Sequence, residues 1–459
     1  MNIKDYKESL KGKRILVVGL GKSGRAAINV LHDLGANLSV QDSNPAGKFD
    51  KEFIEFLDGN KIVKYLGEVP SDMSKFDMLV LSPGVPTDLE FIQDAKSENV
   101  EIIGELELAY RLTEGKYVAI TGTNGKTTTT TLVGEIFKAA GKETSVVGNI
   151  GNPVVTEAIK SREDSWMVAE VSSFQLETVL EFKPVVSAIL NLTPDHLNRH
   201  KTMEAYGQAK AAIFANQSED NYLIINYDDK LCYSLAKTCK AKIVPFSRKE
   251  KLDFGAYLYG ETLVLKDGEK CLEICKASEL RIIGDHNIEN VLASAAICYF
   301  AGIEMEVISK AIKAFPGVEH RIEFCGEING VKYYNDSKGT NVDASVIAIK
   351  ALKNNIILIA GGDGKSQDFT DLANHLKGSV KALVLLGRDA PIIEETAKKA
   401  GFTAIYNEKD MQGVVKKCYE LAKSGDSVLL SPACASWDMY PNFEVRGEDF
   451  KTCVKELSK

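Results

Sequence analysis

The stretch that decides the fold is Tyr117-Val-Ala-Ile-Thr-Gly-Thr-Asn-Gly-Lys-Thr-Thr128. It opens with a short apolar run at 117–120, typical of a buried strand, and passes through a glycine turn into a helical stretch. Gly125-Lys-Thr127 is the functional half of a phosphate-binding loop (P-loop), although Ile120 stands where the strict pattern has its first glycine. In such a loop backbone amides surround phosphate, the lysine contacts the β- and γ-phosphate oxygens, and the hydroxyl ligates Mg²⁺. We therefore expect an ATP site built from Gly122, Thr123, Asn124, Gly125, Lys126, Thr127 and Thr128.

The same order of strand, glycine turn and helix restarts twice elsewhere in the chain. One series begins at 14–18 and runs to about Gly104, and another begins near 331–334. This rhythm predicts parallel sheets with helices on both faces. The sequence thus predicts an α/β protein of three domains: a Rossmann-like N-terminal domain, a central P-loop ATPase-type parallel-sheet domain with a β-rich insertion, and a Rossmann-like C-terminal domain. We place these domains at 1–104, 105–317 and 318–459.

The pattern of alternating strands and helices gives way to hairpin-like segments between residues 220 and 285, where we expect the β-rich insertion. The segments 257–265 and 271–274, with a turn at 266–269, have the pattern of a hairpin. The apolar positions of 287–300 then keep the three-to-four spacing of a helix. Phe315-Pro-Gly317 breaks the chain after that helix and sets the boundary before the third domain.

Composition and charge exclude several classes of protein. Of the 459 residues 44% are hydrophobic and 26% are charged, which is ordinary for a globular protein and rules out a disordered or collagen-like chain. The net charge of −8 argues against binding to nucleic acid or anionic membranes, which needs clustered positive charge. No apolar run approaches the ~20 residues of a membrane span, and residues 1–14 lack the apolar core of a signal peptide. The nine cysteines form no CxxC pair, so we expect reduced thiols and a cytoplasmic location.

A second glycine motif, Gly19-Leu-Gly-Lys-Ser-Gly24, follows the expected strand at 14–18. It matches G-x-G-x-x-G, in which the backbone approaches a diphosphate at a helix N-terminus. Asp42 ends the next expected strand and can accept hydrogen bonds from a ribose or a base. Taken alone, the motif allows a nicotinamide dehydrogenase, another diphosphate ligand, or a tight turn without a ligand. The ATP site at 117–128 disfavours the dehydrogenase, because hydride transfer does not require ATP.

Polar side chains follow two expected strands of the central domain. Glu170 ends one of them, and His196 follows the next in Asn191-Leu-Thr-Pro-Asp-His196. Because ligands gather at the carboxyl ends of parallel strands, we expect Glu170 and His196 to converge with Lys126. Glu170 has the position of a second Mg²⁺ ligand beside a P-loop. His200 has no such support, so we expect it at the surface or in local structure.

At this point the residues resemble a family, the Mur ligases, which are ATP-dependent amide-forming enzymes of peptidoglycan synthesis, and the likeness spans essentially the whole chain. The family-wide motifs are Gly122-Thr-Asn-Gly-Lys-Thr127, Asn149-Ile-Gly151, Asp195-His196, His286-Asn287 with Asn290, and His320-Arg321. Motifs similar to the D-glutamate-adding branch are Ser172-Ser-Phe-Gln-Leu-Glu177, Asn335-Asp-Ser-Lys-Gly-Thr-Asn341, and Leu430-Ser-Pro-Ala-Cys-Ala-Ser-Trp-Asp438 with Phe443 and Arg446-Gly447. The D-N-P-R motif of the diamino-acid-adding branch is absent, and Gly339 and Trp437 depart from the usual residues.

The resemblance implies a cytoplasmic, monomeric ligase that joins D-glutamate to UDP-N-acetylmuramoyl-L-alanine through an acyl phosphate and binds neither nucleic acid nor a membrane. Other Mur ligases and folylpolyglutamate synthase are the alternatives among ligases, and an ATP-regulated scaffold is the alternative outside them. By family position the UDP substrate contacts Ser23, Asp42, Ser43, Ser82, Gly84, Asn149 and His196. D-glutamate contacts Lys338, Thr340, Lys365, Ser436 and Phe443.

The resemblance also implies further nucleotide, metal and catalytic residues. Beyond the P-loop, the ATP site includes Asn287, Asn290, Arg321 and Asp336. Two Mg²⁺ ions, for which Mn²⁺ can substitute, are held by Thr127, Glu170, His196 and a carbamylated Lys210. The catalytic set is Lys126, His196, Lys210 and Arg321, because positive charge stabilises phosphoryl transfer. The sequence around Lys210 alone is that of an ordinary solvated helix lysine, so only the family position supports its role.

Overall fold

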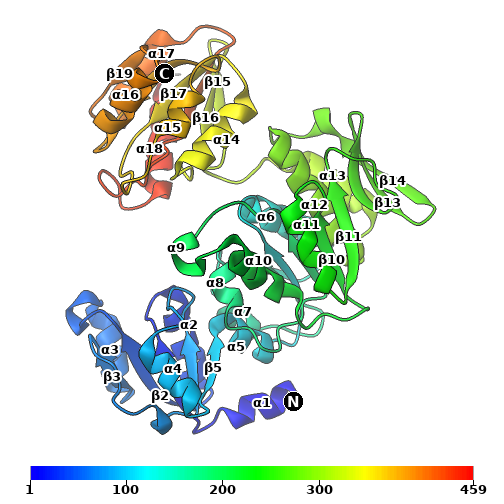
Figure 1. The fold of residues 1–459 in the computed structure, drawn as a ribbon, viewed down its shortest axis with the longest axis vertical. Coiled ribbons are helices and arrows are strands. Elements are labelled where there is room, and N and C mark those ends of the chain that lie inside the picture. The colour runs from blue at the N-terminus through cyan, green and yellow to red at the C-terminus, as the bar shows by residue number, and fades with distance from the viewer. Residues whose placement is uncertain (1, 458–459) are drawn as a thin grey trace. The chain divides into compact units, whose positions relative to one another are not determined.

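The computed structural model describes residues 2–457, which form three β-sheets flanked by helices (Figure 1). This confirms the α/β class. The chain divides into two compact units, one made of residues up to 279 with 288–313, and the other of 280–287 with 314–459. Among the described residues all nine cysteines are free thiols, and no helix is long and apolar enough to cross a membrane.

The first sheet is parallel, with strand order β3-β2-β1-β4-β5. Its strands are β1 Arg14–Val18, β2 Asn37–Asp42, β3 Val63–Leu66, β4 Met78–Leu81 and β5 Glu101–Gly104. The helices of this region are α1 Ile3–Ser9, α2 Lys22–Asp33, α3 Lys51–Gly59 and α4 Glu90–Ser97. The strand order reverses between β1 and β4, and a crevice at the carboxyl ends of such a strand pair is the usual ligand site of an open α/β sheet.

The second sheet has nine strands in the order β14-β13-β12-β11-β10-β9-β6-β8-β7. Its parallel part contains β6 Lys116–Thr121, β7 Thr144–Gly148, β8 Trp166–Glu170, β9 Val186–Ile189, β10 Tyr222–Asn226 and β11 Lys242–Ser247. The helices are α6 Lys126–Ala139, α7 Val154–Ala158, α8 Ser173–Leu176, α9 Leu197–His200, α10 Met203–Ala211, α11 Lys230–Ser234, α12 Asp285–Phe300 and α13 Met305–Ala314. The P-loop therefore joins a central strand, β6, to α6.

The expected hairpin in the β-rich insertion is wrong in its detail. Residues 257–265 are not one strand, because β12 Gly255–Tyr259 ends at Gly260, whose φ of +60° turns the chain into β13 Thr262–Asp267. Asp267, expected in the turn, pairs with Lys270 of β14 Lys270–Lys276, so the second turn is only Gly268-Glu269. Glycine supplies the positive φ that two-residue hairpin turns need. The insertion is thus a three-stranded meander, and it extends the central sheet through β11 rather than forming a sheet of its own.

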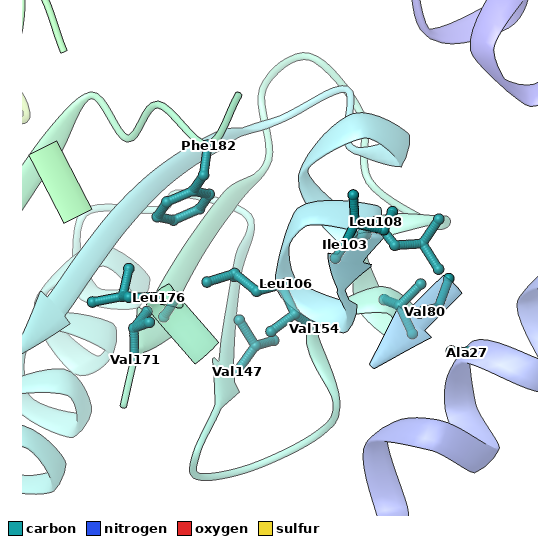
Figure 2. Close-up of a cluster of buried hydrophobic side chains, with 14 of the residues drawn as sticks. Ala27, Val80, Ile103, Leu106, Leu108, Val147, Val154, Val171, Leu176 and Phe182 are labelled. Carbon is teal, nitrogen blue, oxygen red and sulfur yellow. The ribbon is translucent and has the colours of Figure 1, made fainter. Parts of the chain in front are cut away.

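One hydrophobic core runs from the first sheet into the second by way of α5 Glu105–Leu112. Figure 2 shows Leu106 of α5 between Ile103, Val80 and Ala27 on one side and Val147, Leu176 and Phe182 on the other. The helix is also fixed by polar contacts, because the buried carboxylate of Glu107 accepts hydrogen bonds from the backbone amides of residues 180–182 at 2.9–3.1 Å. This shared core explains why the first two sheets belong to one compact unit.

The third sheet has the strand order β15-β16-β20-β17-β18-β19. Its strands are β15 Glu323–Ile328, β16 Val331–Asn335, β17 Ile356–Ala360, β18 Val380–Leu385, β19 Ile405–Asn407 and β20 Ser427–Leu430. The helices are α14 Val342–Leu352, α15 Thr370–Asn374, α16 Ala390–Lys399, α17 Met411–Leu421 and α18 Phe443–Glu456. The sequence reading missed β15, which pairs antiparallel with β16 at the edge and lacks the apolar run of the inner strands.

Candidate active site

The P-loop is shaped by glycine and held by asparagine side chains. Gly125 has a φ of +84°, and a Cβ atom at that position would lie 2.2 Å from Asn290 Oδ1, so only glycine fits. The structure thereby brings Asn290 of α12, one of the residues predicted for the nucleotide, against the loop. From the other side, Asn191 Oδ1 accepts hydrogen bonds from the backbone amides of Asn124 at 2.8 Å and Thr123 at 3.1 Å.

Two lysine side chains meet at one carbonyl oxygen of the loop. Lys126 Nζ donates to Gly122 O at 2.9 Å and to Thr123 O at 2.8 Å, and Lys210 Nζ donates to the same Gly122 O at 2.8 Å. Lys210 is only 1% exposed and lies over the ring of Tyr206. Burial, reinforced by the charge of Lys126, holds the pKa of Lys210 well below its usual range. The solvated lysine that the local sequence suggests is therefore not what the structure shows.

Glu170, at the end of β8, presents an unsatisfied carboxylate oxygen. The residue is 2% exposed, and its Oε1 accepts a hydrogen bond from Asn149 Nδ2 at 3.0 Å. Its Oε2 is buried and has no hydrogen-bond partner in the structure. A buried, unpaired carboxylate oxygen is costly unless a cation or donor meets it. Thr127, in the first turn of α6, supplies a hydroxyl of the kind that P-loops use, so these residues fit one Mg²⁺ ion.

The predicted second metal site is less complete. Within residues 2–457, no three His, Cys, Asp or Glu side chains form a group that can hold a metal ion. His196, the residue directly before α9, has a φ of +53°, and its half-exposed ring packs on Phe174 with a centroid distance of 4.8 Å. Its Nε2 lies 3.4 Å from Asp195 Oδ2. A ligand set at this position would require an additional anionic group, such as a carbamate.

His200 is not a surface residue. It is 8% exposed, and its Nε2 lies 2.9 Å from Ser173 Oγ. Its ring stacks on Phe174, and burial lowers its pKa. The second half of the prediction, that His200 serves local structure, is confirmed, because the residue anchors α9 to α8.

The first glycine motif borders a cavity of about 780 Å³ at the carboxyl ends of β1, β2 and β4. Five of the residues predicted for the UDP substrate line it: Ser23, Asp42, Ser43, Ser82 and Gly84. A Cβ atom on Gly24 would lie 1.9 Å from Gly19 O, so this glycine permits the close packing of α2 on the turn. The other two predicted residues, Asn149 and His196, do not line the cavity and lie with the Glu170 and Phe174 contacts described above.

Asp42 holds the glycine turn rather than pointing freely into the cavity. Its Oδ2 accepts a hydrogen bond from the backbone amide of Leu20 at 2.8 Å, and its Oδ1 accepts one from that of Asn44 at 2.9 Å. Oδ1 also accepts a hydrogen bond from Asn44 Nδ2 at 2.9 Å, so the second lone pair of Oδ2 is the one that remains open to a ribose or base.

In the second unit, Asp336 organises the segment that carries Arg321. The buried carboxylate of Asp336 accepts hydrogen bonds from Ser431 Oγ at 2.7 Å and from the backbone amide of Ile322 at 3.3 Å. Burial raises the pKa of Asp336 to about 6. Arg321 Nε is buried without a hydrogen-bond partner, as expected of a donor that awaits an anion. Asn287, which was also predicted for the nucleotide, is buried and donates to Ile283 O at 2.7 Å.

The residues predicted for D-glutamate come from three loops of the second unit and from the start of α18. Lys338 Nζ lies 5.6 Å from the ring of Phe443, and Lys365 Nζ lies 4.3 Å from the ring of Trp437. Lys365 has a φ of +51°, an uncommon backbone conformation that often accompanies function. Thr340 lies in the loop with Lys338, and Ser436 is buried next to Trp437.

Arg446 has a structural role that the sequence motif around it did not predict. The residue is 2% exposed, and its guanidinium donates to Ser337 Oγ at 3.0 Å, to Ser337 O at 2.9 Å and to Cys434 O at 3.1 Å. It therefore ties the loop after β16 to the loop after β20. The one available sequence signal is that Arg446-Gly447 stands in the quoted motifs of this region.

Three family models match the chain. They are Mur ligase MurD-like, N-terminal domain, over residues 13–104, Mur ligase middle domain over 120–298, and Mur ligase, glutamate ligase domain, over 320–434. Among curated proteins the chain is 50% identical to the UDP-N-acetylmuramoylalanine--D-glutamate ligase of Clostridioides difficile, over 98% of this chain and 99% of that protein. It is 48% identical to the protein of the same name from Alkaliphilus metalliredigens, with the same coverage.

Solved structures share the fold at low sequence identity. The UDP-N-acetylmuramate-alanine ligase MurC of Thermotoga maritima has a TM-score of 0.61 at 20% identity, covering 97% of this chain and 100% of its own. MurF from Acinetobacter baumannii has a TM-score of 0.59 at 16% identity, covering 98% and 93%. At this level of identity the likeness concerns the fold, and it agrees with the three-sheet architecture.

Proposed function

The chain belongs to the Mur ligase family, and from that premise we propose that it joins D-glutamate to UDP-N-acetylmuramoyl-L-alanine at the expense of ATP. It is an ATP-dependent ligase of peptidoglycan synthesis, and its relatives at about half identity over their full length carry that activity in their name. In the structure, the observation that supports the proposal is that Lys126 and Lys210 both bind Gly122 O of the P-loop while Glu170 keeps a buried oxygen without a hydrogen-bond partner. A scaffold without chemistry has no need of either.

The reaction needs ATP because a carboxylate is a poor electrophile. The carboxylate of the L-alanyl group attacks the γ-phosphorus of ATP, so that ADP leaves and an acyl phosphate forms. The amine of D-glutamate then attacks the acyl carbon, and the tetrahedral intermediate collapses to an amide with loss of phosphate and a proton. Catalysis of phosphoryl transfer rests mainly on positioning and charge neutralisation.

The residues of the P-loop bind and orient the phosphates. The backbone amides at the start of α6 suit an anion, and Lys126 Nζ, which donates to two carbonyls of the loop, would donate to a phosphate oxygen of bound ATP. Thr127 and Glu170 would hold Mg²⁺, which when bound supplies positive charge to the phosphate oxygens. Arg321, by family position, supplies a further positive charge.

Lys210 is proposed to carry a carbamate. Its ammonium first loses a proton, and the neutral amine then adds CO₂, forming an N–C bond and releasing a second proton. A cation that cannot ligate a metal thereby becomes an anion with two oxygens. Burial beside Lys126 supports this, since it favours the neutral amine that reacts with CO₂. His196 would share the second ion with this carbamate.

The cavity beside the glycine motif is proposed for the uridine diphosphate end of the substrate, with Ser23, Asp42, Ser43, Ser82 and Gly84 as its contacts. Lys338, Thr340, Lys365, Ser436 and Phe443 are proposed for D-glutamate, because two lysines and two hydroxyls suit a dicarboxylate. We further propose that the protein acts in the cytoplasm as a monomer.

Phosphate release tests the proposal. Purified protein with ATP, Mg²⁺ and UDP-N-acetylmuramoyl-L-alanine should release phosphate only when D-glutamate is added, and L-glutamate should fail because its amine cannot reach the acyl phosphate while both carboxylates are bound. Turnover with a diamino acid instead would assign the chain to another branch of the family. Turnover with L-glutamate at a comparable rate would overturn the assigned amino-acid site.

A further inference from the structure

Arg199, which no part of the proposed mechanism uses, joins two regions that are far apart in the sequence. Its Nη1 donates to Gly84 O at 3.3 Å, and its Nη2 donates to Val85 O at 2.9 Å. The same guanidinium pairs with Glu177, with Nε to Oε1 at 3.3 Å and Nη2 to Oε2 at 2.5 Å. Both side chains of this ion pair are only 16% exposed.

On one side Arg199 holds a wall of the cavity proposed for uridine diphosphate. Gly84 and Val85 line that cavity. Their loop is fixed to the glycine turn, because Ser82 Oγ donates to Gly19 O at 2.6 Å. This bond does not involve Arg199, so the loop and the glycine turn can keep the shape of the cavity without it, and Arg199 instead fixes the cavity edge to its own segment.

On the other side Arg199 is built into the segment that carries His196. Its guanidinium carbon lies 4.8 Å from the ring centroid of Phe174, and the ring of His196 packs on that same Phe174 at 4.8 Å. Arg199 also lies in α9, the helix that directly follows His196. Phe174 lies in α8 and Glu177 directly follows it, and α8 itself follows the strand ending in Glu170.

The geometry suits arginine and no other residue type. A planar guanidinium presents five donors in a fixed arrangement, so it can bind a carboxylate by two bonds while donating to two backbone carbonyls. A lysine has one nitrogen and cannot span these partners at once. Because the pair is mostly screened from water, its bonds keep more strength than those of a surface ion pair.

We propose that Arg199 is a positioning residue that sets the distance between the cavity for uridine diphosphate and the His196 end where the acyl group reacts. The inference rests on the proposed function, because only a substrate that spans both places requires a fixed spacing. A ligand that occupies the cavity alone, or the P-loop alone, does not depend on Arg199.

The test compares the long substrate with its nucleotide end. In Arg199→Met the KM for UDP-N-acetylmuramoyl-L-alanine should rise roughly tenfold to hundredfold, as expected from loss of charged hydrogen bonds. The KM for ATP and the Kd for UDP, measured by calorimetry, should stay within about twofold of the wild-type values. Arg199→Lys should recover part of the loss, because one of the carbonyl contacts can be remade.

Arg14→Met is the matched control. Arg14 forms a similar two-bond pair with Asp77, at 2.6 and 3.1 Å, at the end of β1 opposite the cavity, so its loss should leave every KM unchanged. If Arg199→Met does not fold, Glu177→Gln weakens the ion pair that holds Arg199 in place and disturbs the fold less. It should raise the KM of the long substrate severalfold.

Two outcomes would overturn the proposal. If UDP and the long substrate both bind equally more weakly to Arg199→Met, Arg199 merely supports the cavity wall. If the KM for the long substrate is unchanged, the contacts of Arg199 have no function in binding. Failure of the proposed function is seen separately, as a wild-type protein that releases no phosphate with D-glutamate.

Discussion

Each compact unit of the molecule buries a carboxylate beside the carboxyl end of a parallel strand, but the two carboxylates have different surroundings. Glu170, at the end of β8, keeps one oxygen without any hydrogen-bond partner. Asp336, just after β16, has an oxygen bound by Ser431 and the other by the backbone of Ile322. The comparison teaches that the strand-end position alone does not decide how a buried carboxylate is used: both oxygens of Asp336 fix loops, whereas Glu170 keeps an oxygen for the Mg²⁺ ion that we propose.

The largest expected effect concerns the carbamate proposed on Lys210, the second anionic group of the proposed metal sites beside Glu170. Lys210→Ala should abolish nearly all turnover, by about a thousandfold or more, while the fold stays intact, because the proposed carbamate is lost. Acetate should restore part of the rate by refilling the vacated position, and bicarbonate should activate the wild-type protein at mildly acidic pH. Steady-state phosphate release measures each effect.

Lys242→Ala is the control for that prediction, because Lys242 also lies over a tyrosine ring, that of Tyr222, but is itself exposed at the start of β11. It should retain wild-type turnover. Normal turnover of Lys210→Ala would make Lys210 a packing residue and would remove the main partner of His196 in the second metal site.

Glu170→Gln should lower kcat roughly a hundredfold to a thousandfold, since an amide oxygen binds Mg²⁺ weakly. Thermal stability should be unchanged or higher, because the variant removes a buried charge that lacks a partner. Differential scanning calorimetry and turnover are measured on the same preparation. A marked loss of stability with full activity would make Glu170 structural, like Asp336, and would erase the contrast between the two carboxylates.

Asp336 should make the free energy of unfolding depend on pH. Its pKa of about 6 in the folded protein lies above the ordinary 3.8, so the folded state binds the proton more tightly than the unfolded state. The resulting stabilisation is present below pH 3.8 and is lost as the pH rises through 6, by up to about 3 kcal/mol. Denaturant unfolding from pH 4 to 7 should show this decline, and Asp336→Asn should reduce it. An identical profile in the variant would contradict the assignment.

The smallest expected effect is at Trp437, which is 65% exposed and lies over Lys365. Trp437→Leu should raise the KM for D-glutamate about two- to fivefold, because an exposed cation–π contact contributes modestly. The KM for ATP serves as the internal control. A larger rise that is equal for both substrates would indicate a damaged fold rather than a mispositioned lysine.

The sequence predicted what repeats along the chain and missed what depends on distant contacts. The three parallel series and the P-loop were recognisable because strand periodicity and glycine spacing are local signals. The second hairpin turn was misplaced because Lys266 and Asp267 are polar, yet they pair with β14 across a two-residue turn. Burial of His200 depends on Ser173 and Phe174, which no pattern around the histidine reveals.

The same limit applied to the candidate site. Glu170 could be predicted from its place after a strand, but its free oxygen could not, because this depends on which donors the folded chain brings near. Local sequence favoured a solvated Lys210, whereas the structure buries it against Gly122 O. Arg199 gave no signal, since its partners Gly84 and Val85 contribute only backbone carbonyls. The individual roles of the site residues, and the three domain boundaries, stay predictions.

The most direct test of the central claim, that the acyl carboxylate is phosphorylated by ATP, is oxygen transfer. UDP-N-acetylmuramoyl-L-alanine is prepared with ¹⁸O in both carboxylate oxygens, and the phosphate released with ATP and D-glutamate is analysed by mass spectrometry. Passage through an acyl phosphate transfers one carboxylate oxygen to the phosphate, so each phosphate should contain one ¹⁸O and each new amide should retain the other. Phosphate without ¹⁸O would show that water attacks ATP instead, and would contradict the mechanism proposed for this chain.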